Sequence, residues 1–182
     1  WHLCGSTVQG GGSYIGHSTT GTTWTHRTQT IANASLYAIW AHSGTNVFVT
    51  GGNGDILHYD GNAWTPMPNP AGTTILRGIW GSAPNNVYAV GDNATMLRYD
   101  GTSWTSVSVS AIGHLRGIWG SAANNIYACH QTTLRHFDGT AWSPAHSAPT
   151  WLRAIHGTGP NEVYVAGIGA VYVYNGLSWS TV

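Results

Sequence analysis

The chain alternates short apolar runs with clusters of turn-forming residues, and this pattern recurs along nearly its whole length. In one copy, apolar and aromatic residues concentrate in four segments, 76–80, 87–90, 96–99 and 103–107, bounded by Gly, Asn, Pro or Asp. Short runs rich in β-branched and aromatic residues between such breakers are typical of β-strands. No stretch carries a sustained helical apolar period, so the pattern predicts strands throughout.

A tryptophan shortly after an Asp-Gly step marks each copy, at intervals of 37 to 40 residues: Trp24, Trp64, Trp104, Trp142 and Trp179. A second aromatic position recurs upstream as Trp40, Trp80 and Trp119, with His156 in the last copy. Four strands in a unit of about 40 residues are typical of a β-propeller blade. We therefore predict an all-β, five-bladed β-propeller of four-stranded antiparallel blades. It forms one domain over 1–182, with repeats of approximately 1–30, 31–70, 71–110, 111–147 and 148–182.

The Asp-Gly step itself predicts the hairpin between the third and fourth strands, because Gly supplies the positive φ of such a turn. It occurs as Asp60-Gly61, Asp100-Gly101 and Asp138-Gly139, with Asn175-Gly176 in the last copy and Thr20-Gly21 in the first. The first copy also has a shortened first strand. We expect a ring of five blades, and an incomplete ring finished by a partner chain is the alternative.

Charge and hydropathy narrow the classes of partner. Charged residues make up 7% of the chain, against roughly 25% in an average globular protein. The six basic residues are all arginine and are balanced by six acids, so no basic stripe for nucleic acid can be drawn. No apolar run approaches the ~18 residues of a membrane span.

The start at Trp1 indicates that a leader was removed or that the true start is not shown. We expect a secreted or cell-surface protein.

The two cysteines, Cys4 and Cys129, are far apart in the sequence. They are expected to be free and buried rather than bridged, and metal-ligand spacing is absent. We predict neither a metal site nor a cofactor.

The repeat WGSAPNNVYAVGDNATMLRYDGTSW resembles a family of secreted bacterial β-propeller repeats of myxobacterial type, with WGS-x-x-N-N-VYAVG followed by L-x-YDG-x-x-W. Its YDGTSW, YDGNAW and FDGTAW pieces are loosely similar to the Asp-box hairpin of other propellers, which has a residue between Asp and Gly. Five short blades also resemble the architecture of tachylectin-type lectins, which bind amino sugars between neighbouring blades. These resemblances imply the fold, and they transfer no catalytic residue.

A carbohydrate site needs an aromatic ring to stack on the sugar and planar donors for its hydroxyl groups. Each copy offers these near the end of its first strand, and we expect them to meet at one rim. The candidates are the rings Trp40, Trp80, Trp119 and His156, the guanidinium groups Arg77, Arg116 and Arg153, and the amides Asn46, Asn86 and Asn125. Alternatively, the arginines line the channel or brace neighbouring blades.

Glycoside hydrolysis would need two carboxylates close together. Three of the six acids belong to the Asp-Gly hairpins, which leaves Asp55, Asp92 and Glu162, and a pair would have to be assembled across repeats. The histidines occupy inequivalent positions, except that His58 and His136 share a third-strand position with Arg98. We predict no catalytic residues and no enzyme.

The pattern as a whole favours a non-catalytic, multivalent, lectin-like extracellular module whose partners are glycans. Several weak sites on one rigid ring gain apparent affinity when the glycan is itself arrayed. The alternative is a structural or interaction subunit of an extracellular coat or filament, which self-assembles through the shortened first blade. A glycan-active enzyme is a distant third.

Overall fold

A computed structural model describes the chain except for residues 1, 7–12, 19–21, 24, 28–34 and 111–112. Its described part forms five antiparallel sheets in chain order. The first sheet has three strands, β1 (His2–Ser6), β2 (Ser13–His17) and β3 (Thr25–Arg27). The second has β4 (Leu36–Ser43), β5 (Asn46–Gly51), β6 (Ile56–Tyr59) and β7 (Trp64–Pro66), with a short 3-10 turn, η1, at Gly52–Gly54.

The remaining three sheets repeat this order. The third sheet has β8 (Leu76–Ala83), β9 (Asn86–Gly91), β10 (Met96–Tyr99) and β11 (Trp104–Ser106). The fourth has β12 (Leu115–Ala122), β13 (Asn125–His130), β14 (Thr133–Phe137) and β15 (Trp142–Ser147). The fifth has β16 (Leu152–Gly159), β17 (Glu162–Gly167), β18 (Ala170–Tyr174) and β19 (Trp179–Thr181). The predicted all-β fold of four-stranded antiparallel sheets is confirmed.

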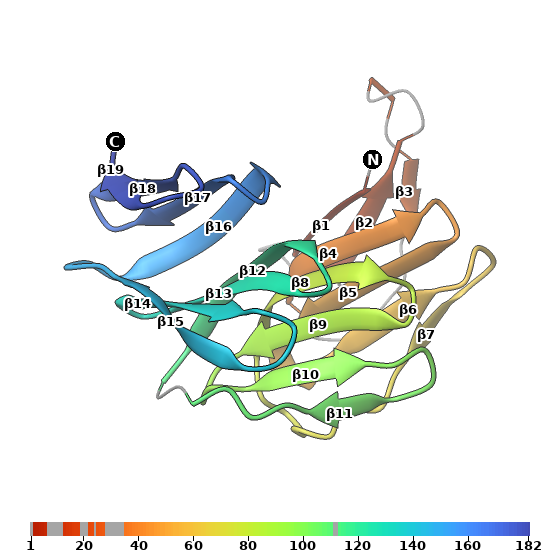
Figure 1. The fold of residues 1–182 in the computed structure, drawn as a ribbon. Coiled ribbons are helices and arrows are strands. Elements are labelled where there is room, and N and C mark those ends of the chain that lie inside the picture. Colours follow the sequence, from red (N-terminus) through yellow and green to blue (C-terminus); the bar gives the residue numbers. More distant parts are fainter. Residues whose placement is uncertain (1, 7–12, 19–21, 24, 28–34, 111–112) are drawn as a thin grey trace.

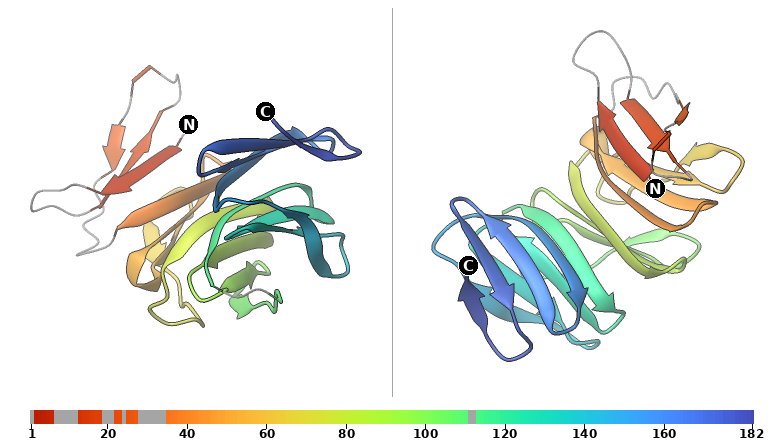
Figure 2. Two further views of the ribbon diagram at one scale, coloured as in Figure 1. Left: turned by 90° about the vertical axis from the view of Figure 1, so that its left-hand side faces the viewer. Right: turned by 90° about the horizontal axis from the view of Figure 1, so that it is seen from above.

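The sheets follow one another along an arc (Figure 1). The first strands β1, β4, β8, β12 and β16 pack successively side by side and line the inner edge of this arc. Figure 2 shows the first and last sheets at its two ends. Five four-stranded blades in a closed ring are not seen, because the first sheet has three strands in the described part of the chain and stands apart from the fifth.

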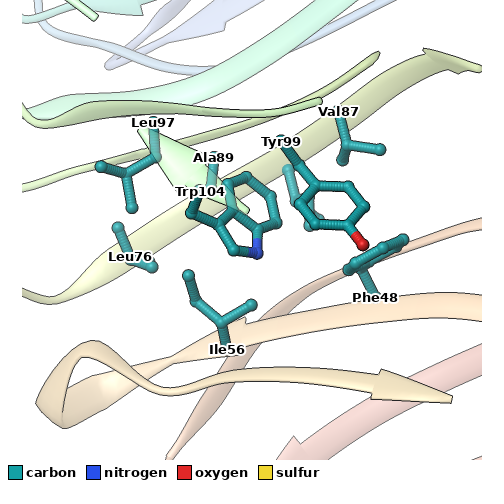
Figure 3. Packing of buried hydrophobic residues seen from close by; sticks show 9 residues of the cluster. Phe48, Ile56, Leu76, Val87, Ala89, Leu97, Tyr99 and Trp104 are labelled. Atoms are coloured by element: carbon teal, nitrogen blue, oxygen red, sulfur yellow. The ribbon is translucent and has the colours of Figure 1, made fainter. Parts of the chain in front are cut away.

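Apolar side chains fill the space between consecutive sheets, because alternate residues of a strand point to opposite faces. Between the second and third sheets, Phe48 and Ile56 meet Val87, Tyr99 and Trp104 (Figure 3). We call the face that carries Phe48 and Ile56, which packs on the next sheet, the leading face, and the opposite one the trailing face. The same arrangement joins the third sheet to the fourth and the fourth to the fifth. Trp104 is buried between the second and third sheets and Trp64 between the first and second, so both act as packing residues.

The Asp-Gly hairpin forms as predicted. The Asp100 carboxylate accepts hydrogen bonds from the backbone N–H groups of Thr102 and Ser103, at 2.8 and 2.9 Å, and Gly101 has φ +101°. Tyr99 donates its hydroxyl proton to the Gly101 carbonyl at 2.9 Å. The turns at Asp60, Asp138 and Asn175 repeat the side-chain bonds to the backbone.

Candidate ligand-binding site

The second residue of each complete first strand sits in a β-bulge. In β8, Leu76 pairs with Gly91 and Gly78 pairs with Val90, so Arg77 is the extra residue of the bulged strand. Equivalent bulges hold Tyr37, Arg116 and Arg153. A bulge re-aims its side chain, and bulges are common next to binding sites.

A small residue follows each bulge and lets the inner strands approach closely. A Cβ on Gly78 would lie 3.4 Å from the Gly117 Cα, and a Cβ on Gly117 would lie 3.4 Å from the Ala154 Cα. Tyr37, Arg77, Arg116 and Arg153 therefore form one row along the inner edge of the arc, which we call the arginine row.

The charges of this row are only partly compensated. The Arg77 guanidinium forms a two-point ion pair with Asp92, with Nε–Oδ1 and Nη2–Oδ2 distances of 2.5 and 2.8 Å. His114 lies 2.9 Å from the same carboxylate. The hydrogen bond from Arg77, opposed by desolvation, lowers the pKa of Asp92. Asp92 also attracts Arg116 over a longer range, but among the described residues no acid forms an ion pair with Arg116 or Arg153.

The register explains this asymmetry. Asp92 comes directly after Gly91, which pairs with Leu76 at the start of β8. The backbone N–H of Asp92 donates a hydrogen bond to the Ile75 carbonyl. Gly52, Gln131 and Ile168 hold the same place in the second, fourth and fifth sheets. Only the third sheet therefore supplies an acid at this place.

Arg116 lies at the centre of the uncompensated part of the row. Desolvation and repulsion by Arg77 and Arg153 lower its pKa, so the three cations lie within electrostatic range of one another. Its Nε is buried and has no hydrogen-bond partner among the described residues. Its guanidinium carbon lies 5.8 Å from the centre of the Trp151 ring. Trp151 and Tyr37 are 44% and 49% exposed, so two accessible rings flank the guanidinium groups.

The structure does not bring the predicted ring, guanidinium and amide together at one rim. Asn86 pairs with Ala83 at one end of β8, whereas Arg77 lies near the other end, so about 20 Å of extended strand separates the two. The amides serve a separate network, in which Arg98 donates to Asn86 at 2.8 Å. His58 and His136 contact Asn46 and Asn125 in the same way, which confirms the shared third-strand position.

The predicted tryptophan ligands lie between sheets. A Cβ placed on Gly81, Gly120 or Gly157 would come within 2.5 to 2.8 Å of the ring of Trp40, Trp80 or Trp119, so each ring rests on a glycine of the next sheet. His156 holds this place in the last sheet and is exposed. Sequence reasoning missed Tyr37, His114 and Trp151, and it considered Asp92 only as an acid for glycoside hydrolysis. Tyr37 could have been found by aligning the repeats on Leu36, Leu76 and their equivalents.

Two cavities recur between neighbouring sheets at the outer rim. Each lies between the segment that follows one sheet and the Asp-Gly hairpin of the next, with volumes of about 220 and 440 Å³. The larger is lined in part by Tyr88, Arg98, Ser108, Phe137 and Trp142. Rings, a guanidinium and hydroxyls at one opening are the groups that a sugar needs.

Other chemistry finds less support in the described residues. Asp55 and Asp92 belong to the same turn in successive sheets but not to equivalent places, since Gly52 is the counterpart of Asp92. No group of three or more His, Cys, Asp or Glu side chains that could hold a metal occurs in the described ranges. Cys129 is free and buried, while the Cys4 side chain lies outside the description. No helix in the described part of the chain is long and apolar enough to cross a membrane.

No family model and no curated protein sequence matches this chain. Solved structures do match its fold. YCF48 bound to D1 peptide superposes with a TM-score of 0.67 at 15% identity, over 93% of this chain and 60% of that one. Virginiamycin B lyase from Staphylococcus aureus, in a catalytically inactive form with quinupristin, gives a TM-score of 0.77 at 14% identity, over 92% and 62%.

These neighbours are β-propellers, and so is the architecture of this chain. One binds a peptide and the other is an enzyme. At such identities the likeness concerns the fold alone. The chain spans about three fifths of the length of either neighbour.

Proposed function

We propose that this protein is a non-catalytic extracellular binding module that holds a carboxylate-bearing glycan at the arginine row. The observation that supports this most directly is the uncompensated cation at Arg116, whose buried Nε lacks a partner among the described residues. Arg116 as a whole is half-buried, so a ligand carboxylate can pair with the accessible part of its guanidinium and supply the ion-pair partner that the described residues do not.

The side chains around Arg116 suit an acidic sugar better than an inorganic anion. A guanidinium can bind a carboxylate through two parallel hydrogen bonds, which fixes the orientation of the ligand. The exposed rings of Trp151 and Tyr37 offer apolar surface to the face of a pyranose. The three arginines of the row and the adjacent Asp92 together carry a net charge of about two positive units, which attracts anions in a chain that is neutral as a whole.

Calorimetric titration with a uronic-acid trisaccharide, against a neutral trisaccharide of the same length, tests the proposal. We expect binding of the acidic ligand only, weakened by salt. Replacing Arg116→Gln should lower affinity at least tenfold, since a hydrogen bond to a charged group contributes roughly 1.5–3 kcal/mol. Arg98→Gln removes an equal charge far from the row and should leave affinity unchanged. Equal affinity in the two variants would refute the proposal.

A peptide carboxylate is the second candidate, because one structural neighbour is bound to a peptide. Acidic peptides with free and amidated C-termini distinguish this from a sugar: binding that depends on the free carboxylate, without binding of the uronic acid, favours the peptide.

The multivalent lectin remains a proposal that rests on the two equivalent cavities between sheets. Binding of neutral or amino sugars that is lost in Trp142→Ala and kept in Arg116→Gln would favour it. The coat or filament subunit is likewise a proposal, and light scattering that shows a monomer at all concentrations would count against it.

A further inference from the structure

The fifth sheet exposes a face that every other four-stranded sheet buries. Tyr88 of the third sheet and Tyr127 of the fourth are both 5% exposed, because the next sheet covers the leading face. The register places Tyr164 at the same position, opposite His156 as Tyr88 is opposite Trp80. Tyr164 is 41% exposed.

The third strand of the fifth sheet is likewise more exposed than its counterparts in the third and fourth sheets. Met96 and Leu134 are buried on the leading faces of the third and fourth sheets. Val171, which pairs with Ala166 as Met96 pairs with Val90, is 39% exposed. The leading face of the fifth sheet thus keeps the apolar composition of an interface without its cover.

We propose that this face is a docking surface for one further blade of the same repeat, which continues the arc in the direction that it has already taken. The leading faces of the second, third and fourth sheets are each covered by the trailing face of a repeat unit, through residues such as Val87, Leu97 and Tyr99.

The structural neighbours agree with such an extension. The arc superposes on about three fifths of two propellers, so their curvature matches that of this chain while leaving room for further blades. A second copy of this chain fits less well, because the sheet at its free end has three strands in the described residues rather than four.

The register shows where a further blade can be joined to the fifth sheet in an experiment. Val182 donates its backbone N–H to the Val171 carbonyl at 2.9 Å, as Val107 donates to the Met96 carbonyl at 2.8 Å. Val182 is therefore the counterpart of Val107. A blade made from residues 108–147, joined directly after Val182, keeps the natural connecting length between the third and fourth sheets.

Cysteine protection tests whether this appended blade docks. In a Cys4→Ser background, Val171→Cys places a thiol on the leading face, and Leu177→Cys places one on the 91% exposed hairpin tip as the matched control. Maleimide labelling is compared in the full chain with and without the appended blade. We expect the blade to slow labelling at position 171 at least tenfold and to leave labelling at position 177 unchanged.

A second fusion separates failure to fold from failure to dock. It appends residues 108–147 followed by 71–110, so that the docking blade has a neighbour of its own. Unchanged labelling at position 171 in both fusions would overturn the proposal. So would slow labelling in the unfused chain together with a mass that rises with concentration in light scattering, because a second copy would then be the occupant. Protection in either fusion, with labelling at 177 unchanged, supports it.

Discussion

Replacing Gly81→Ala should loosen the contact between the second and third sheets. A Cβ at this position would lie 2.7, 2.9 and 3.0 Å from three carbons of the Trp40 ring. Trp40 also packs against Phe48, with ring centres 6.2 Å apart, so its ring has little room to move away. Overpacking of this kind costs about 1–3 kcal/mol. At roughly 2–4 °C per kcal/mol for a chain of this size, thermal unfolding should shift downward by roughly 2–12 °C.

Gly44→Ala is the matched control, because a Cβ on Gly44 meets nothing within 4 Å. Like Gly81→Ala, it lowers the conformational entropy of the unfolded chain, which stabilises the folded protein by about 0.4–1 kcal/mol. Unlike Gly81→Ala, it brings no clash. Thermal and urea unfolding of both variants isolate the contact. In a Trp40→Phe background, which removes the ring that the new methyl would meet, Gly81→Ala should cost little, so the two changes should be non-additive. Equal stability of Gly81→Ala and Gly44→Ala would refute the packing argument.

Three further predictions concern charge and burial. Asp92→Asn frees Arg77 from its ion pair and should raise the affinity for the acidic trisaccharide. Gln131→Asp should give Arg116 an ion-pair partner and lower that affinity. A titration in which Asp92→Asn binds more weakly than Gln131→Asp would contradict the site. Bonds from backbone N–H groups lower the pKa of Asp100 below 3.8, so its contribution to stability is present above that value and is lost as pH falls through the lowered pKa. Asp100→Asn, which copies Asn175, should fold normally and show less loss of stability in acid unfolding. Burial raises the pKa of the Cys129 thiol, so a disulfide reagent should modify it in Cys4→Ser only after unfolding by urea.

The repeat pattern predicted the sheets well because the same physical demands recur in each copy. A hairpin needs an acceptor for its free N–H groups and a residue with positive φ, and Asp100-Gly101 satisfies both locally. Trp104 recurs because each interface between sheets needs a large ring. Closure of the arc is different, since it depends on small angles between sheets that no single repeat encodes.

The site was predicted in part. Arg77, Arg116 and Arg153 were proposed as donors of a sugar site, with the lining of the channel as the alternative, and the structure gathers them in one row along the inner edge of the arc. Their part in ligand binding stays a prediction. Their separation from the amides could not be foreseen without the strand length and the bulges. In an eight-residue strand, residues near opposite ends cannot share a rim, although they are close in sequence.

The bulge explains how a strongly repetitive chain can carry a local site. Its backbone geometry is the same around Tyr37, Arg77, Arg116 and Arg153, so the side chain there can change without altering the sheet. The facing position also varies, and it holds Gly52, Asp92, Gln131 or Ile168 in successive sheets. Because the bulge recurs while the bulge residue and the facing residue both vary, each blade can carry its own charge at this place. The uncompensated charge therefore falls on the fourth and fifth sheets, where Arg116 and Arg153 lie without a facing acid among the described residues.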